Sequence, residues 1–157
     1  MLVRELDERN FVKQLGPFVL VERPYAKEEV STGAPKVTQP LRKATKRRAS
    51  VLDFEDLWVA TLPPMSQHDV FSIGRSPDCD VVLDEGTVSK HNARIHWSND
   101  QAELEDLGSS NGTLLNGKKL AASARLRLGD NDAIDFGNVQ VYYLECITLR
   151  TRLRGKA

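Results

Sequence analysis

Five polar side chains fall in predicted turns of a strand-rich region, and their chemical types suit them to hold an anion. They are Arg75, Ser89, Lys90, Ser110 and Asn111. Guanidinium, ammonium, hydroxyl and amide groups all donate hydrogen bonds, and a β-scaffold can present such groups from its loops. None of the five stands beside a base that would turn it into a nucleophile. The first interpretation is therefore a binding site, with no catalytic residues and no enzyme activity.

The net charge of zero conceals a strong segregation of charge along the chain. Residues 1 to 50 carry eleven Lys or Arg against six acids, and residues 150 to 157 add four cations. Residues 51 to 149 hold seven cations against sixteen acids, which gives a charge of −9. Such a surface is a poor general receptor for nucleic acid, whose phosphates require clustered cations. We expect no nucleic-acid partner, and any anion must be captured locally, which makes Arg75 and Lys90 conspicuous.

Short stretches of alternating apolar and polar residues follow one another from residue 52 onward, with turn-forming residues between them. This pattern is typical of an all-β fold. Asn116 and Gly117 predict a two-residue hairpin, because a type I′ turn needs positive φ at both central positions. Alternation also predicts that Leu126 and Leu128 point inward. Together these signals favour a β-sandwich. The predicted strands cover residues 57–62, 70–73, 80–83, 93–97, 101–106, 113–115, 124–128, 132–136 and 138–149.

The ends of the chain differ in composition from this region. Residues 1–25 are predicted to be a partly ordered N-terminal extension, with an amphipathic helix over 3–15 and a short strand at 18–22. Residues 26–51 read as a basic, proline-containing linker, residues 52–149 as the sandwich, and residues 150–157 as a basic C-terminal tail.

The linker contains the basic run LRKATKRRAS at residues 41–50. The plainest interpretation of this run is a solvated tether, followed by a docking strip for an acidic surface and then by nucleic acid. Thr38, Thr45 and Ser50 are candidate phosphorylation sites, and a phosphorylated linker threonine would be able to fold back toward Arg75. Unmodified tether residues are the simpler alternative.

The loop residues resemble the forkhead-associated (FHA) domain family over about residues 54 to 149. Five blocks agree in the right order, which makes chance agreement improbable. The matching residues are Gly74 and Arg75 with Ser76 and the strand DCDVVL; Ser89, Lys90 and Ala93; Asp106 to Thr113; Asn116 and Gly117; and Gly129, Asp130, Ile134 and Gly137.

This resemblance implies an eleven-stranded β-sandwich whose loops at one end bind phosphothreonine peptides. The protein would then be an adaptor module in serine/threonine kinase signalling, without a cofactor. Its partner would be a phosphothreonine-containing protein, either a serine/threonine kinase or a substrate of one. The alternative is a phosphorylation-independent scaffold or assembly protein that uses the same sandwich.

The same resemblance assigns roles to the five loop residues. Phosphothreonine offers a charge of about −1.5 to −2 and three strong acceptor oxygens. Arg75 would give a planar fork of donors, Ser89 a hydroxyl, and Lys90 its ammonium or its backbone N–H. Ser110 would shape the wall beside the phosphothreonine, and Asn111 would hold the peptide backbone through its amide.

Four further residues are expected to support these loops. Gly74, Gly108 and Gly112 allow close approach or tight turns. Asn92 stands where the family usually has a histidine that braces the binding loop. We expect Asn92 to make one of the histidine's hydrogen bonds and to fill less space, while the neighbouring His91 points to the opposite side.

The remaining signals bound the class of protein. Cys79 and Cys146 are far apart and lack metal-ligand spacing with His68, His91 or His96, so we expect buried thiols, no metal site and no required disulfide. No stretch is long and apolar enough for a membrane span, and a signal peptide is not evident, which predicts a cytoplasmic protein with no membrane partner.

Overall fold

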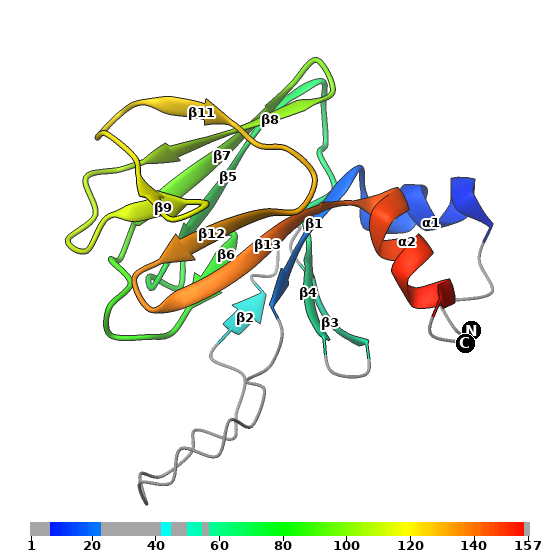
Figure 1. The fold of residues 1–157 in the computed structure, drawn as a ribbon, viewed down its shortest axis with the longest axis horizontal. Helices are drawn as coiled ribbons and strands as arrows, with labels where there is room; N and C mark the ends of the chain where they lie inside the picture. Colours follow the sequence, from blue (N-terminus) through cyan, green and yellow to red (C-terminus); the bar gives the residue numbers. More distant parts are fainter. Residues whose placement is uncertain (1–6, 23–41, 45–49, 55–56, 156–157) are drawn as a thin grey trace, which may run out of the picture.

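The computed structural model describes residues 7–22, 42–44, 50–54 and 57–155 of the chain, and these form a sandwich of two β-sheets with two helices at one end (Figure 1). One sheet has the strand order β10-β9-β12-β13-β1-β4-β3, and the other has the order β11-β8-β7-β5-β6-β2. The prediction of an all-β sandwich is confirmed, and the described residues hold thirteen strands when the two-residue strand β10 is counted.

The elements follow the chain in this order: α1 Glu8–Leu15, β1 Phe18–Glu22, β2 Arg42–Ala44, β3 Ser50–Phe54, β4 Leu57–Thr61, β5 His68–Gly74, β6 Val81–Leu83, β7 Ala93–Ser98, β8 Gln101–Asp106, β9 Thr113–Leu115, β10 Lys118–Lys119, β11 Arg125–Arg127, β12 Asp132–Phe136, β13 Val139–Glu145 and α2 Cys146–Gly155.

Strand β1 lies in the middle of the seven-stranded sheet, between β13 and β4. Its residue Phe18 stacks on Tyr143 with ring centroids 5.1 Å apart and meets Phe71 edge-on at 5.8 Å in the sandwich core. Val19 and Val21 face the other way, into a second apolar cluster. A continuous apolar run such as FVLVE is expected where both faces of a strand are buried. The predicted domain boundary, which starts the sandwich at residue 52, therefore leaves out β1, a strand from the interior of the sheet.

The second apolar cluster joins helices α1 and α2 to the outer face of this sheet. Phe11 and Leu15 of α1 and Leu149 and Leu153 of α2 are all buried in it. Asp7 caps α1, and its carboxylate accepts the backbone N–H of Asn10 at 2.9 Å. Residues 1–6, which include the beginning of the helix predicted over 3–15, lie outside the described residues.

Helix α2 corrects the prediction of one strand over residues 138–149. Strand β13 ends at Glu145, and the helix begins at Cys146 and continues to Gly155, inside the segment predicted as a basic tail. Cys146, Leu149 and Leu153 recur at helical spacing, so a helix buries all three on one face, which a strand cannot do.

Parts of the segment predicted as a linker also belong to the sheets. Strand β2 pairs with β6, and β3 pairs with β4, where Ser50 lies opposite Thr61. The other two candidate phosphorylation sites, Thr38 and Thr45, lie outside the described residues.

Strand β11 differs from the prediction in the placement of one side chain. Leu128 is buried as expected, but Leu126 is 44 % exposed. The reason is position, because β11 is the end strand of the six-stranded sheet and has β8 as its neighbour on one side. No helix among the described residues combines the length and apolar character needed to cross a bilayer.

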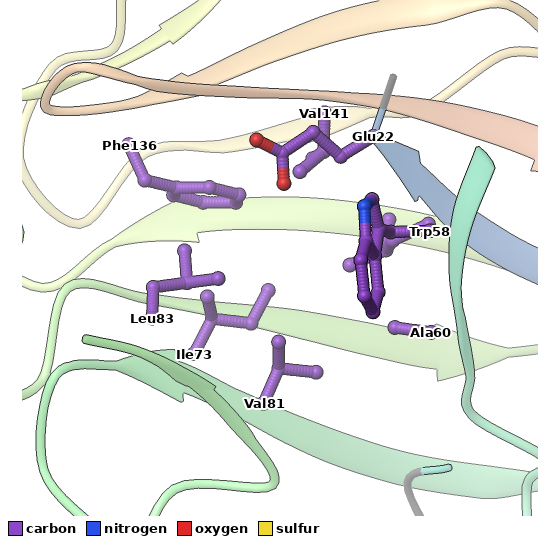
Figure 2. A pocket seen from close by; sticks show the side chains of 9 residues that line it. Glu22, Trp58, Ala60, Ile73, Val81, Leu83, Phe136 and Val141 are labelled. Carbon is purple, nitrogen blue, oxygen red and sulfur yellow. The ribbon is translucent and has the colours of Figure 1, made fainter. Parts of the chain in front are cut away.

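The space between the sheets is nearly filled. One gap of about 10 Å³ remains, and Figure 2 shows Glu22 and Trp58 among the apolar side chains around it. A gap of this size is at the limit for a single water molecule, so it is a packing feature and not a ligand site.

Candidate functional site

Three loops meet at the end of the sandwich opposite the helices (Figure 1). They are residues 75–80 after β5, residues 84–92 after β6 and residues 107–112 after β8. The structure brings all five predicted residues together on these loops. The N–H of Arg75 donates to the carbonyl of Ser89 at 2.9 Å, and the N–H of Ser110 donates to the Ser89 hydroxyl at 2.9 Å. Lys90 joins the first loop, since its carbonyl accepts the N–H of Ser76 at 3.0 Å.

Gly74 is required for the first two loops to approach each other. A Cβ atom at this position would lie 2.2 Å from the carbonyl oxygen of Lys90. Glycine therefore sets the distance between the Arg75 loop and the Ser89 loop.

Arg75 is exposed, but part of its guanidinium is fixed. Its Nε donates to the carbonyl of Val88 at 3.0 Å, and within the described part of the chain the two terminal nitrogens keep their N–H donors for other partners. Among the residues that the structure describes, no carboxylate pairs with Arg75. The fork of donors is thus oriented and available to a ligand.

The Ser89 hydroxyl is also oriented by the protein. Its oxygen accepts the N–H of Ser110, while the backbone N–H of Ser89 donates to Asn92 Oδ1 at 3.0 Å. Because the oxygen already accepts, the hydroxyl hydrogen can serve a ligand.

Asn92 anchors a buried chain of hydrogen bonds beneath these loops. Its Nδ2 donates to Thr113 Oγ1 at 2.9 Å, and Thr113 Oγ1 donates to Asp106 Oδ1 at 2.7 Å. All three side chains are at most 4 % exposed. The side chain of Asn92 thus makes two hydrogen bonds, one with Ser89 and one with Thr113.

Asp106 extends this chain into the third loop. Its carboxylate accepts the N–H of Gly108 at 2.9 Å and the N–H of Ser109 at 3.2 Å. The next residue, Ser110, donates its backbone N–H to the Ser89 hydroxyl. This bond closes a ring of contacts that joins the loop of residues 84–92 to the loop of residues 107–112. Such a network rigidifies the backbone that carries the site.

Asn111 is exposed and is tied to a residue that sequence reasoning missed. Its Nδ2 donates to the carbonyl of Thr87 at 2.8 Å, which leaves its second N–H and its Oδ1 for other partners. Thr87 Oγ1 also accepts the N–H of Asn138 at 2.8 Å. A Cβ on Gly137 would lie 2.4 Å from the Thr87 carbonyl oxygen, so only glycine allows this close contact. Gly137 fits the FHA pattern, and it was the one sequence signal of the contact with Thr87.

Gly108 and Gly112 both have positive φ, at 74° and 79°. Gly112 has a second constraint, because a Cβ there would lie 2.6 Å from Cε of Lys119. Lys119 thus lies across the third loop, and nothing in the sequence pattern indicated this contact.

Cys79 lies beside His91, although their spacing gave no reason to expect it. Its sulfur is 3.7 Å from His91 Nδ1, and the thiol donates to the carbonyl of Lys90 at 3.3 Å. Burial raises the pKa of the Cys79 thiol, which keeps it protonated at neutral pH. Cys79 therefore supports the loop from behind, and His91 is exposed as predicted.

A separate polar cluster lies on the outer face of the six-stranded sheet. His96 Nε2 is 2.7 Å from Glu105 Oε2, and Arg125 Nε is 3.3 Å from the same oxygen. Burial alone would raise the pKa of Glu105, but the hydrogen bond and charge of His96, followed by those of Arg125, outweigh it and lower that pKa. His96 faces outward, and its partner is a carboxylate on the neighbouring strand.

Comparison with known proteins identifies the domain that carries these loops. Residues 71–137 match the FHA domain, and this part of the chain belongs to that family. The match contains all five predicted binding residues and the whole buried chain beneath them.

Two relatives illustrate the extent of the similarity. The chain is 38 % identical over 77 residues to an oxoglutarate dehydrogenase inhibitor of Corynebacterium jeikeium, covering 49 % of this chain and 51 % of the relative. It is 32 % identical over 75 residues to the glycogen accumulation regulator GarA of Mycobacterium tuberculosis, covering 48 % of this chain and 44 % of the relative. The chain thus spans about half the length of the curated relatives it matches.

A solved structure supports the fold over a larger part of the chain. The FHA domain of an Arabidopsis thaliana hypothetical protein superposes with a TM-score of 0.53 at 19 % identity, covering 82 % of this chain and 86 % of that one. At this identity the likeness concerns the fold alone.

Proposed function

We propose that the three joined loops bind a phosphothreonine-containing segment of a partner protein. The observation that carries this proposal is the orientation of two donors from different loops. The guanidinium of Arg75 is held by Val88, and the hydroxyl of Ser89 is held by Ser110, so both have donors left for a ligand. Oriented, charge-assisted donors suit a phosphate dianion, and this end of the FHA domain offers them in an otherwise acidic region.

Each group has a distinct task in this proposal. The terminal nitrogens of Arg75 donate to two phosphate oxygens, and Ser89 donates to the third. Lys90 adds a positive charge or its backbone N–H. Asn111 uses its remaining amide groups on the peptide backbone, and Ser110 forms the adjacent wall.

The partner in this proposal is a serine/threonine kinase or one of its substrates, because such kinases generate phosphothreonine. The two relatives carry the names of an inhibitor and a regulator, which supports a regulatory binding role rather than catalysis. The cytoplasm, where such kinases act on their substrates, is the proposed location.

Binding of a phosphothreonine peptide to the parent protein and to Arg75→Ala tests this function. A peptide selected from an oriented library is titrated by fluorescence anisotropy, alongside its unphosphorylated form. Loss of one charged partner of a desolvated pair costs about 2 to 5 kcal/mol, so Arg75→Ala should weaken binding by at least about 30-fold. Arg94→Ala is the matched control, since Arg94 is an exposed arginine of strand β7.

Two outcomes would count against phosphate recognition. One is unchanged affinity in Arg75→Ala. The other is equal binding of the unphosphorylated peptide, which would favour the phosphorylation-independent scaffold instead.

A further inference from the structure

Lys119 lies beside the proposed phosphopeptide site but belongs to a different element. It is the last residue of β10 and pairs with Leu114 in the hairpin that follows the third loop. Its Cε, Cδ and Cγ lie 2.6, 3.3 and 3.3 Å from the point where a Cβ on Gly112 would stand. The aliphatic part of the side chain therefore runs across Gly112, next to Asn111.

The path of this side chain depends on glycine in two ways. A Cβ at 112 would push the end of the Lys119 side chain aside, and any other residue there would also have to adopt a φ of +79°. Gly112 is itself buried. Because the ammonium is one bond beyond Cε, the contact keeps the charge near the loop that carries Ser110 and Asn111.

The charge of Lys119 has no acidic counterpart in the described part of the chain. No carboxylate there pairs with it, although the region from 51 to 149 carries sixteen acids against seven cations. In the same region Arg125 does pair with an acid, Glu105. An exposed lysine can cover a glycine with its aliphatic stem while its ammonium remains available to a ligand.

We propose that Lys119 forms a cationic subsite that binds an acidic side chain of the same peptide, close to the phosphothreonine. This subsite rests on the proposed function, and it defines the preferred ligand as a phosphothreonine segment with a nearby Asp or Glu. An extended peptide advances about 3.3 Å per residue, so an acid a few residues away can reach a group beside Asn111 while the phosphate contacts Arg75.

A set of phosphothreonine peptides tests the subsite directly. The reference peptide has alanine around the phosphothreonine, and glutamate is placed singly at each of the three positions on either side. At one position glutamate should strengthen binding to the parent about two- to five-fold, as expected of an exposed ion pair. Lys119→Met, which keeps an unbranched stem over Gly112 but removes the charge, should abolish that gain.

Lys118→Met is the matched control. Lys118 is the adjacent exposed lysine of β10, and alternation along a strand directs it to the other face. It should keep the glutamate gain. Persistence of the gain in Lys119→Met, an equal loss in both variants, or the absence of any position with a gain would overturn the subsite.

The reference peptide separates this proposal from the proposed function. It should bind the parent and Lys119→Met with the same affinity, because it offers no carboxylate to Lys119. If the parent bound none of the phosphopeptides, the proposed function would fail and the subsite with it. If the reference bound but no glutamate effect depended on Lys119, the subsite alone would fail.

Discussion

Replacement of Asn92 by alanine tests whether the buried chain beneath the loops stabilises the site. The substitution removes an acceptor for the Ser89 N–H at 3.0 Å and a donor to Thr113 Oγ1 at 2.9 Å. The Asn92 side chain is 1 % exposed, its bond to Thr113 is buried, and its bond to Ser89 is part-buried. In Asn92→Ala the backbone N–H of Ser89 would lose its acceptor. Ser89 is also the residue whose hydroxyl belongs to the proposed binding site.

The magnitude follows from these two bonds. A buried hydrogen bond contributes about 1 kcal/mol, and a buried donor left without a partner costs about 1 to 3 kcal/mol. We expect Asn92→Ala to lower the free energy of unfolding by about 2 to 4 kcal/mol. In a chain of this size that corresponds to a fall in Tm of about 5 to 15 °C.

Urea and thermal unfolding of the parent and the variant measure this loss. Asn138→Ala is the control, because the side chain of Asn138 is exposed and its bond to Thr87 uses the backbone N–H, which alanine retains. A change in stability within about 0.5 kcal/mol for Asn92→Ala would refute the reasoning, since it would mean that the chain of hydrogen bonds contributes nothing.

Three further substitutions probe other parts of the structure. Gly74→Ala should destabilise the protein by about 1 to 3 kcal/mol in urea unfolding, because its Cβ would meet the backbone of the facing loop at 2.2 Å, whereas Gly86→Ala, with nothing within 4 Å, should be neutral or slightly stabilising. Leu149→Ala should cost about 2 to 5 kcal/mol if α2 belongs to the folded unit, and Ile147→Ala, at a position 51 % exposed, should cost much less. Glu105→Gln should be less stable than the parent at pH 7, and the difference should shrink as the pH falls below 4.5, because a carboxylate whose folded-state pKa is lowered from its ordinary 4.5 loses its stabilising effect as it becomes protonated. Equal stabilities within the glycine pair or within the apolar pair, or a Glu105→Gln difference that does not shrink as the pH falls below 4.5, would contradict these assignments.

The strands and loops of the sandwich could be predicted because their signals are local. Residues 93–97 were predicted as a strand, and Ala93, Ile95 and Trp97 alternate into the core, where all three are buried. Asn116 and Gly117 both have positive φ, as the hairpin prediction requires. Strand alternation and turn residues depend on neighbours in the sequence, so they can be interpreted without knowing the tertiary contacts.

The ends of the chain were harder to predict because their role depends on distant partners. The run FVLVE reads as a strand, but nothing within it shows that it enters the sheet between β13 and β4. Likewise, the apolar residues of α2 are spaced for a helix, but the apolar surface that they cover is formed by α1 together with the outer face of the sheet. Leu126 was predicted to point inward from the alternation of its strand, but it is exposed on an end strand. The alternation of one strand does not show where the sheet ends.

The site shows the same division between local and distant signals. The residue types of the five binding candidates and their place on loops were visible in the sequence, and the structure brings those loops together. The contacts between Cys79 and His91 and between Lys119 and Gly112 join residues that share no motif. They arise from the way loops pack, which sequence spacing alone does not encode.

Titration of isotopically labelled protein with a phosphothreonine peptide, followed by amide chemical shifts in NMR spectra, tests the central claim most directly. We expect the largest changes at residues 74–76, 87–92 and 108–112, no change in the helices at the opposite end, and no change with the unphosphorylated peptide. Changes centred on the helices or on the outer sheet faces, or the same changes with the unphosphorylated peptide, would contradict it.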